Sequence, residues 1–316
     1  MHHKYKQQTS NRQARTSKYK EKLVPHMKSE TVKEFNFTKS DFERVRALIH
    51  QRAGISLADS KQEMVYSRLA RRLRAIGIVS FGHYLDELEA GRLGEEWEAF
   101  TNALTTNLTS FFREAHHFPL LLEHMKTVRE QPLTIWCSAS STGEEPYSIA
   151  MTACEAFNTL TPPVQIIATD IDTSVLSVGE RGVYALDRLD KMSPERARRF
   201  FQRGKGAQEG MVRVRPELRQ LVTFNQLNLL SERWPLSGQF DVIFCRNVMI
   251  YFDKATQRKI LARFVPLMKP RALLFAGHSE NFLYVSESLK LRGKTVYELD
   301  ERRAARELQQ LRPDHG

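Results

Sequence analysis

Hydrophobic residues recur at helical spacing through residues 34–106, after an N-terminal segment that is largely polar. Apolar positions three and four residues apart predict amphipathic helices that each bury one face. Ser40 and Glu43 predict a capping box at the start of the first helix, and Gly54 is expected to end it. The pattern therefore predicts a small all-α domain with helices near residues 40–53, 61–76, 80–88 and 97–104.

From Leu133 onward the pattern changes to short apolar runs that alternate with helix-length segments. Such runs predict buried strands, and their alternation with helices predicts an α/β fold built on a mostly parallel sheet. The expected strands are Leu133–Cys137, Val164–Ala168, Phe240–Cys245, Ala272–Ala276 and Thr295–Leu299. The expected helices are Glu144–Phe157 and those that begin near Thr173 and Asp253.

This alternation is interrupted between residues 184 and 228. Gly204, Gly206 and Gly210 precede the run Met211–Arg215, in which apolar and basic residues alternate. A period of two predicts a strand with one buried face, and the glycines before it predict a hairpin turn. We therefore expect a small antiparallel insertion at 184–228, in which Met211–Arg215 offers an exposed strand edge.

The turn after the first predicted strand carries candidate binding chemistry. A single glycine, Gly143, precedes Glu144 and Glu145 at the predicted start of a helix. A turn that binds a pyrophosphate needs several glycines, and two carboxylates would repel phosphate. Carboxylates instead suit a positively charged cofactor such as S-adenosylmethionine. Neighbours on a helix diverge by about 100°, so we expect one glutamate to face the cofactor, and the sequence leaves open which.

The next two predicted strands also end in polar residues at the same expected edge of the sheet. Asp170 and Asp172 follow the second strand, and Arg246 and Asn247 follow the third. An acidic residue at the end of the second strand is where such folds hold ribose hydroxyls. Together the three strand ends predict a methyltransferase-like, Rossmann-type sheet.

Composition supports a globular protein of two domains. The chain has 316 residues, 41% hydrophobic and 27% charged, which is enough apolar material for an ordinary core. No apolar stretch approaches the roughly eighteen residues of a membrane span, and no secretory signal is present, so we expect no membrane insertion. Cys137, Cys154 and Cys245 lie on predicted strands or an apolar helix face, which predicts buried thiols in a reducing cytoplasm.

The net charge of +11 is unevenly distributed. Residues 1–30 contain eight Lys or Arg and two Glu, so six of the excess charges lie there. The composition of this segment is typical of a disordered, solvated tail, and we expect no nucleic-acid partner. His116 and His117 are adjacent and would point in different directions on a helix, so no metal site is predicted.

Four motifs along the chain have a shared order and spacing: Thr105–Glu114, Ser141–Ser148, Ala168–Asp172 and Cys245–Phe252. In these motifs the chain resembles the chemotaxis receptor (protein-glutamate) O-methyltransferase family over residues 34 to 300. The resemblance implies an enzyme that transfers methyl from S-adenosylmethionine to glutamate side chains of bacterial chemoreceptors and releases S-adenosylhomocysteine. It also implies a cytoplasmic protein that is recruited to receptor clusters, and we expect a monomer.

The resemblance implies roles for particular residues. It places Arg113, Arg246 and Tyr251 at the reacting groups, where a guanidinium offers two parallel donors to a carboxylate. The residues expected to bind or line the cofactor are Asn107, Thr109, Arg113, Glu145, Asp170, Asn228, Leu229, Cys245 and Arg246.

A basic helix face is the candidate docking surface. Arg68, Arg71, Arg72 and Arg74 lie within seven positions, with Glu63 as the only matching acid. Basic helix faces are usually only solvated, but the resemblance implies acidic methylation helices as the partner, which such a face would attract. In some members of the family the antiparallel insertion adds a C-terminal receptor peptide as an extra strand, and the glycine-rich turn here is similar to theirs.

These expectations divide the chain into a disordered basic tail (1–33), a helical receptor-docking domain (34–106), a methyltransferase domain (107–300) and a C-terminal tail (301–316).

Two rival functions are a nucleic-acid methyltransferase, suggested by the pI of about 9.6, and a non-catalytic receptor-binding module. Base-methylating enzymes need a flipped-base pocket, and amino-methylating enzymes carry an Asn/Asp-Pro-Pro-aromatic turn where this chain has Cys245–Val248. A module without turnover is not expected to retain the acidic and arginine positions.

Overall fold

The computed structural model describes residues 33–128, 130–283 and 285–310, with the side chains of 306–310 excepted. By its contacts the chain divides into two units, Met1–Glu34 and Phe35–Gly316. The architecture below is that of the second unit. The predicted basic tail lies almost entirely outside the described residues.

Four helices with a shared apolar core form the first domain. Two predicted boundaries are confirmed, because Gly54 ends the first helix and Ser80 caps the third. The predicted capping box is wrong in its residues. The helix begins at Lys39, so Thr38 is its N-cap residue. The amide of Thr38 donates to Asp41 at 2.9 Å, and this pair forms the capping box in place of Ser40 and Glu43. The helices are α1 (Lys39–Ala53), α2 (Gln62–Ile76), α3 (Phe81–Glu89) and α4 (Glu96–Leu104).

A seven-stranded sheet in the order β6-β2-β1-β7-β8-β10-β9 is the centre of the second domain. Strands β6, β2, β1, β7 and β8 are parallel, and β10 runs antiparallel between β8 and β9. The strand order reverses between β1 and β7, which is the point where open α/β sheets bind ligands. The strands are β1 (Leu133–Cys137), β2 (Val164–Asp170), β6 (Val222–Gln226), β7 (Phe240–Cys245), β8 (Met268–Ala276), β9 (Leu289–Gly293) and β10 (Val296–Leu299).

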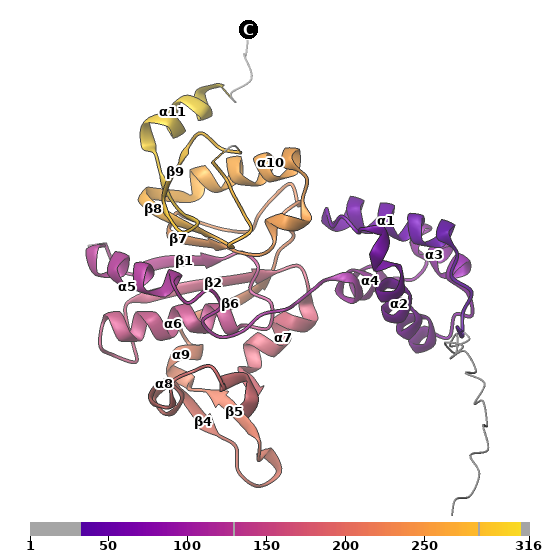
Figure 1. The fold of residues 1–316 in the computed structure, drawn as a ribbon, viewed down its shortest axis with the longest axis horizontal. Helices are drawn as coiled ribbons and strands as arrows, with labels where there is room; N and C mark the ends of the chain where they lie inside the picture. Colours follow the sequence, from indigo (N-terminus) through magenta and orange to yellow (C-terminus); the bar gives the residue numbers. More distant parts are fainter. Residues whose placement is uncertain (1–32, 129, 284, 311–316) are drawn as a thin grey trace, which may run out of the picture. The chain divides into compact units, whose positions relative to one another are not determined.

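Helices cover both faces of this sheet (Figure 1). Ile135 and Cys137 of β1 pack in one core cluster with residues of α5 (His117–Thr127) and α6 (Glu144–Ala156). Trp136 points to the opposite face and packs with α10 (Lys254–Phe264). Strand β1 is thus buried on both faces, which is why its sequence is a continuous apolar run. The remaining longer helices are α7 (Thr173–Arg181) and α11 (Glu301–Gln310).

The predicted antiparallel insertion is a separate three-stranded sheet with the order β3-β5-β4. The helices α8 (Pro194–Phe200) and α9 (Pro216–Arg219) accompany the strands β3 (Val183–Ala185), β4 (Phe201–Arg203) and β5 (Met211–Val214). Two predicted details are corrected. Strand β5 pairs on both sides, so the edges are offered by β3 and β4 and not by Met211–Arg215. The insertion also ends before β6, which joins the main sheet beside β2. Hydrophobic period shows that a strand exists but not which strands it pairs with.

Among the described residues, no helix has the length and apolar character that crossing a membrane requires.

Candidate active site

A cavity of about 270 Å³ lies at the carboxyl edge of the parallel strands. The segments after β2, β6 and β7 contribute Asp170, Asn228 and Arg246 to its wall. Residues 53–58, at the end of α1, and 104–109, in the linker after α4, also line it. The cavity therefore occupies the crevice at the reversal of strand order, and both domains build it.

Gly143 shapes the turn between β1 and α6. Its φ of +96° lies in the left-handed region, and a Cβ there would lie 2.8 Å from Gly179 Cα and 2.9 Å from the Tyr184 hydroxyl. Glycine is required because no other residue fits this approach. The turn thus uses its glycine to pack against α7 and β3, which agrees with the sequence-based inference that it is no phosphate cradle.

The two glutamates at the start of α6 have different surroundings. Glu145 lines the cavity, and its carboxylate accepts hydrogen bonds from Arg246 Nη1 at 2.6 Å and from the Cys137 thiol at 3.2 Å. Glu144 is fully buried and pairs with Arg188. Of the two, Glu145 is the one that lines the cavity, and its contact with the cofactor stays a prediction.

Asp170 ends β2 at the cavity wall. Its carboxylate accepts hydrogen bonds from the backbone amides of Ser141 at 2.8 Å and Asp172 at 3.0 Å, which fixes its orientation. Burial raises the pKa of Asp170 to about 6, although those amide hydrogen bonds oppose the shift. Asp170 is therefore a buried acceptor at the position where this class of fold binds ribose.

Arg246 and Arg113 both line the cavity but are held differently. Arg246 is 4% exposed and donates to Glu145 and, at 2.5 Å, to the backbone carbonyl of Arg113. Arg113 is half-buried and donates to the Leu108 carbonyl at 2.6 Å. Burial raises the pKa of Glu145, and the guanidinium of Arg246 opposes this shift. Arg246 is thus an internal brace, whereas Arg113 is the more accessible guanidinium.

The linker between the domains is fastened to the end of β2 through Asp172. Thr105 Oγ1 and Asn107 Nδ2 each donate to Asp172 Oδ2 at 2.7 Å. The other oxygen of Asp172 caps α7 by accepting from the Ser174 amide at 2.9 Å. This arrangement positions Asn107 and Thr109 in the cavity wall.

Three further predicted residues, Asn228, Leu229 and Tyr251, line the cavity. Asn228 Nδ2 donates to the carbonyl of Arg52 at 2.8 Å and so ties α1 to the loop after β6.

Cys245, which was also predicted to line the cofactor, is not part of the cavity wall. It is completely buried at the end of β7, and burial raises the pKa of its thiol well above the ordinary value. Of the residues at this strand end, Arg246 and Asn247 line the cavity and Cys245 does not. Contact of Cys245 with a cofactor therefore stays a prediction.

Sequence reasoning missed Glu280, which fixes the loop after β7. Its carboxylate accepts hydrogen bonds from the backbone amides of residues 247–249, at 2.8 to 3.0 Å, and of Gly277 at 2.6 Å. This one side chain therefore positions the loop that begins at Arg246. Because the loop that it holds lies about thirty residues away in sequence, no local pattern marks Glu280.

Glu114, at the end of the first motif, is a second residue to which the sequence pattern assigned no role. It accepts hydrogen bonds from Asn247 Nδ2 at 3.3 Å and His278 Nδ1 at 3.0 Å, and it lies 3.4 Å from Arg246. Burial acts to raise the pKa of Glu114, but the His278 hydrogen bonds and the charge of Arg246 outweigh it and lower the pKa to about 2. Glu114 therefore joins the loops around positions 114, 247 and 278 as an ionised group.

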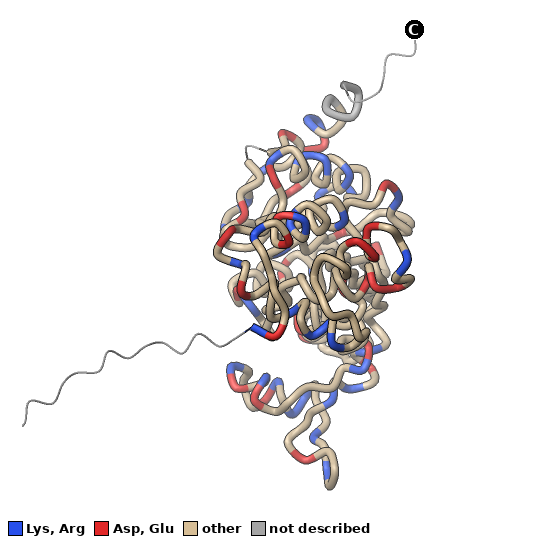
Figure 2. Tube along the Cα trace, turned by 90° about the vertical axis from the view of Figure 1, so that its right-hand side faces the viewer, with Lys and Arg blue, Asp and Glu red and all other residues tan. Residues whose placement is uncertain are grey.

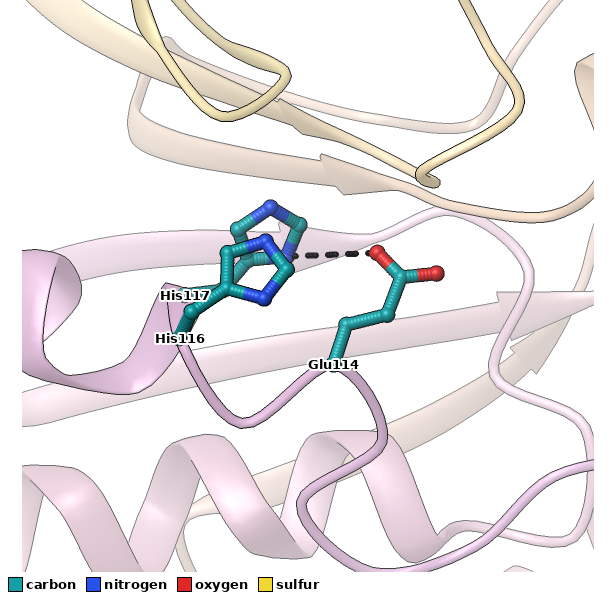
Figure 3. Close-up of side chains that lie close together, drawn as sticks. All are labelled: Glu114, His116 and His117. Carbon is teal, nitrogen blue, oxygen red and sulfur yellow. Dashed lines mark ion pairs between the residues drawn. The ribbon is translucent and has the colours of Figure 1, made fainter.

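Two adjacent histidines lie beside Glu114 (Figure 3). His117 Nδ1 is 3.8 Å from Glu114 Oε2, and the rings of His116 and His117 are 4.3 Å apart. The expectation that the two rings diverge assumed that both residues lie within a helix. Helix α5 begins at His117, and His116 precedes it as the N-cap residue, so only one of the two residues lies within the helix. Burial lowers the pKa of His117 to about 4.

Arg68 and Arg72, of the predicted docking arginines, make hydrogen bonds within the helical domain. Arg68 donates to two carbonyl groups at the end of α4, and Arg72 makes a bidentate pair with the buried carboxylate of Glu96 at 2.7 and 3.0 Å. Arg71 and Arg74 are exposed. Elsewhere Lys and Arg are interspersed with Asp and Glu along most of the trace (Figure 2). The docking hypothesis therefore depends on Arg71 and Arg74.

The sheet order, the turn at Gly143, and a cavity lined by Asp170 and Glu145 at the strand ends define an S-adenosylmethionine-dependent methyltransferase. Residues 107–297 match the family described as "CheR methyltransferase, SAM binding domain", and residues 40–105 match "CheR methyltransferase, all-alpha domain". The chain belongs to the CheR methyltransferase family, and its cofactor is S-adenosylmethionine.

Relatives with known names agree with this assignment. The chain is 55% identical over 258 residues to the chemotaxis protein methyltransferase of Escherichia coli (strain K12), covering 82% of this chain and 90% of that protein. It is 57% identical to the Klebsiella aerogenes protein of the same name, covering 82% and 89%. It is 53% identical to chemotaxis protein methyltransferase 2 of Pseudomonas aeruginosa, covering 84% and 94%.

Proposed function

We propose that the protein transfers the methyl group of S-adenosylmethionine to glutamate side chains of chemoreceptors, and that donor and acceptor meet in the cavity at the reversal of strand order. The observation that carries this proposal is that two carboxylates and a partly accessible guanidinium line one cavity. Asp170 at the end of β2, Glu145 at the start of α6 and Arg113 all contribute to its wall. The names of the relatives, chemotaxis protein methyltransferases, support the substrate class.

The reaction requires no general base. A glutamate carboxyl has an unperturbed pKa of about 4.3 and is ionised at neutral pH. One carboxylate oxygen forms a bond to the methyl carbon while the carbon–sulfur bond breaks and its electron pair passes to sulfur. The products are a methyl ester and S-adenosylhomocysteine, and no proton is transferred. The site must therefore align the two reactants and exclude competing water.

In this proposal the residues divide the work by position. Asp170 accepts hydrogen bonds from the ribose hydroxyls. Glu145, braced by Arg246, provides negative charge toward the amino group of the donor. Arg113, the more accessible guanidinium, orients the acceptor carboxylate through two parallel donors. Tyr251 completes the wall beside the reacting groups.

Substrate recruitment extends beyond the cavity. We assign docking of acidic methylation helices to the exposed arginines of α2, Arg71 and Arg74. A C-terminal receptor peptide adds to the small sheet at one of its edge strands, β3 or β4, because backbone groups at an edge are available for pairing. Residues 183–221 carry ten Lys or Arg and five Asp or Glu, which favours an acidic peptide. We place the protein in the cytoplasm at receptor clusters, acting as a monomer.

The proposal is tested by incubating the protein with methyl-labelled S-adenosylmethionine and receptor-containing membranes. We expect label on the receptor that mild base releases, as it releases a methyl ester. Receptors in which the methylated glutamates are replaced by alanine serve as the control. Label on added DNA or RNA would favour the nucleic-acid rival, and receptor binding without any transfer would favour the non-catalytic one. Adding free C-terminal receptor peptide should reduce labelling if the small sheet binds it.

A further inference from the structure

We propose that Glu114, His116 and His117 form a binding site for a divalent transition-metal ion, Zn²⁺ being the best match, and that an ion bound there slows methyl transfer. Two imidazoles and one carboxylate are a donor set that Zn²⁺ accepts, with a fourth position left to water or another ligand. The three side chains lie close together (Figure 3), and Glu114 lies 3.4 Å from Arg246.

The distances are compatible with coordination after small side-chain movements. One ligand atom from each of the three residues lies within 4.8 Å of the others, and His117 Nδ1 lies 3.8 Å from Glu114 Oε2. Zn²⁺ binds nitrogen and oxygen at about 2.0–2.2 Å, which places tetrahedral ligands roughly 3.3–3.6 Å apart. His278 Nδ1 lies 3.0 Å from the other carboxylate oxygen, Glu114 Oε1, and so holds the carboxylate from outside the group of three ligands.

The second observation is that two buried acceptor atoms point into this site without a hydrogen bond. Within the described residues, neither His117 Nδ1 nor Glu114 Oε2 has a hydrogen-bond partner, although His117 is 0% exposed. Burying the His117 nitrogen without a hydrogen bond costs free energy, whereas Glu114 Oε2 is partly compensated by its ion pair with Arg246 at 3.4 Å. His117 Nε2 lies 2.9 Å from the carbonyl of Lys294 and must donate to it, so Nδ1 carries the free lone pair. A histidine that ligates a metal usually donates its other ring N–H to a carbonyl in this way.

The charge of Arg246 sets the functional consequence of metal binding. Its Nη2 lies 3.4 Å from Glu114 Oε2, the same oxygen that the metal would take. The neighbouring carboxylate of Glu145 offsets this positive charge at 2.6 Å, so a cation is tolerated but competes with Arg246 for Glu114. Coordination therefore withdraws Glu114 from Arg246 and disturbs the brace that holds the Arg113 carbonyl. By thermodynamic linkage the effect is reciprocal: any change that stabilises the contacts of Arg246 with Glu114 and the Arg113 carbonyl lowers the affinity for the metal ion.

The binding experiment uses the full-length chain and Co²⁺, whose visible d–d bands report four-coordinate binding, followed by displacement with Zn²⁺. His2 and His3, outside the described residues, are replaced by alanine in every sample to remove an alternative site in the tail. We expect 1:1 binding in this background and an affinity at least about tenfold weaker in His116→Ala. The matched control is His83→Ala, because His83 Nδ1 lies 3.9 Å from Glu87 with no third ligand among the described residues.

The outcomes are decisive in both directions. Equal affinity in the parent background, His116→Ala and His83→Ala overturns the site, and so does the absence of Co²⁺ bands in the parent background. His117→Gln, which keeps a donor for Lys294, should also lose the bands if the ring is a ligand. Methyl transfer is then measured with and without saturating Zn²⁺. We expect several-fold slower turnover in the parent background and no change in His116→Ala, and equal inhibition of both overturns the regulatory part. Metal binding is measured without donor or receptor, so it does not depend on the proposed function.

Discussion

Single residues in this cavity gain their properties from burial and from their partners. Asp170 and Glu145 are both 8% exposed, and burial raises the pKa of each. They differ in their partners, because Asp170 accepts from backbone amides whereas Glu145 faces the guanidinium of Arg246. The Asp170 carboxylate therefore has no neutralising cation among its described hydrogen-bond partners and remains available to a ligand.

Asp170 predicts a pH dependence of cofactor binding. A carboxyl with a pKa of about 6 is protonated below that pH and accepts the ribose hydroxyls poorly. Affinity for S-adenosylmethionine should therefore be full above about pH 6 and fall as the pH drops through it. Asp170→Ala should lose at least about tenfold in affinity for each charged hydrogen bond removed. Calorimetry from pH 5 to 8 checks both points, and a flat profile in the parent protein would exclude this role of Asp170.

Arg113 predicts a loss of turnover that differs from a loss of binding. Arg113→Lys keeps the charge but not the planar pair of donors. A misplacement of about 1 Å can cost on the order of a hundredfold in rate, so kcat should fall about that far while cofactor affinity stays measurable. Single-turnover kinetics with receptor membranes measures this. Arg246→Lys is the comparison, and it should weaken the cofactor as well because Arg246 braces Glu145. Near-normal kcat in Arg113→Lys would assign the orienting role elsewhere.

At the scale of elements, two carboxylates hold the loops that form the cavity wall. Glu280 fixes the loop after β7 through its backbone amides, and Asp172 fixes the linker after α4 through Thr105 and Asn107. Neither side chain needs to touch the cofactor. Their effect is to give flexible connections one geometry, since loops without such partners are the mobile parts of a fold.

Glu280→Ala should disorder the loop after β7. Each hydrogen bond from a backbone amide to the carboxylate is worth about 1.5–3 kcal/mol, and the amides of residues 247–249 would lose their acceptor. We expect a lower midpoint of urea unfolding and lower kcat, with faster hydrogen exchange confined to this loop. Glu287→Ala, a substitution of an exposed glutamate a few residues on, is the control. Unchanged exchange at 247–249 would contradict the positioning role.

At the scale of the whole molecule, the helical domain serves two purposes. It closes the cavity with residues 53–58 and 104–109, and it presents the basic face of α2. Arg72 stabilises the helical domain itself, because its pair with buried Glu96 holds α2 to α4. A charge reversal at Arg72 would therefore disturb folding and could not test docking. The exposed positions, Arg71 and Arg74, are the ones to change.

The double variant Arg71→Glu, Arg74→Glu should raise the KM for receptor without changing affinity for S-adenosylmethionine. The effect should shrink as salt rises, because the Debye length is about 8 Å at physiological ionic strength. Methylation rates at varied receptor and salt concentration measure it. Arg258→Glu with Lys259→Glu makes the same charge change on exposed positions of α10 and should leave KM near the parent value. Equal effects of the two double variants on KM would show that net charge, and not a docking surface on α2, determines the affinity for receptor.

The sequence by itself determined the local elements and the chemistry of the site. Apolar period predicted the four helices of the first domain, the helices α6, α7 and α10, and the central strands β1, β2 and β7, because a buried face requires apolar residues at regular spacing. It did not predict α5. The single glycine and the acids after β1 and β2 predicted the kind of cofactor, because charge and turn geometry are local properties.

Tertiary structure alone decided which groups meet. The pairing of β5 on both sides, the place of β6 in the main sheet, and the choice of Glu145 over Glu144 depend on contacts between distant segments. The contacts of Arg72 with Glu96 and of Glu114 with Arg246 arise in the same way. One-dimensional patterns record whether a residue is buried, but a buried charge is satisfied by a partner that only the folded chain brings to it.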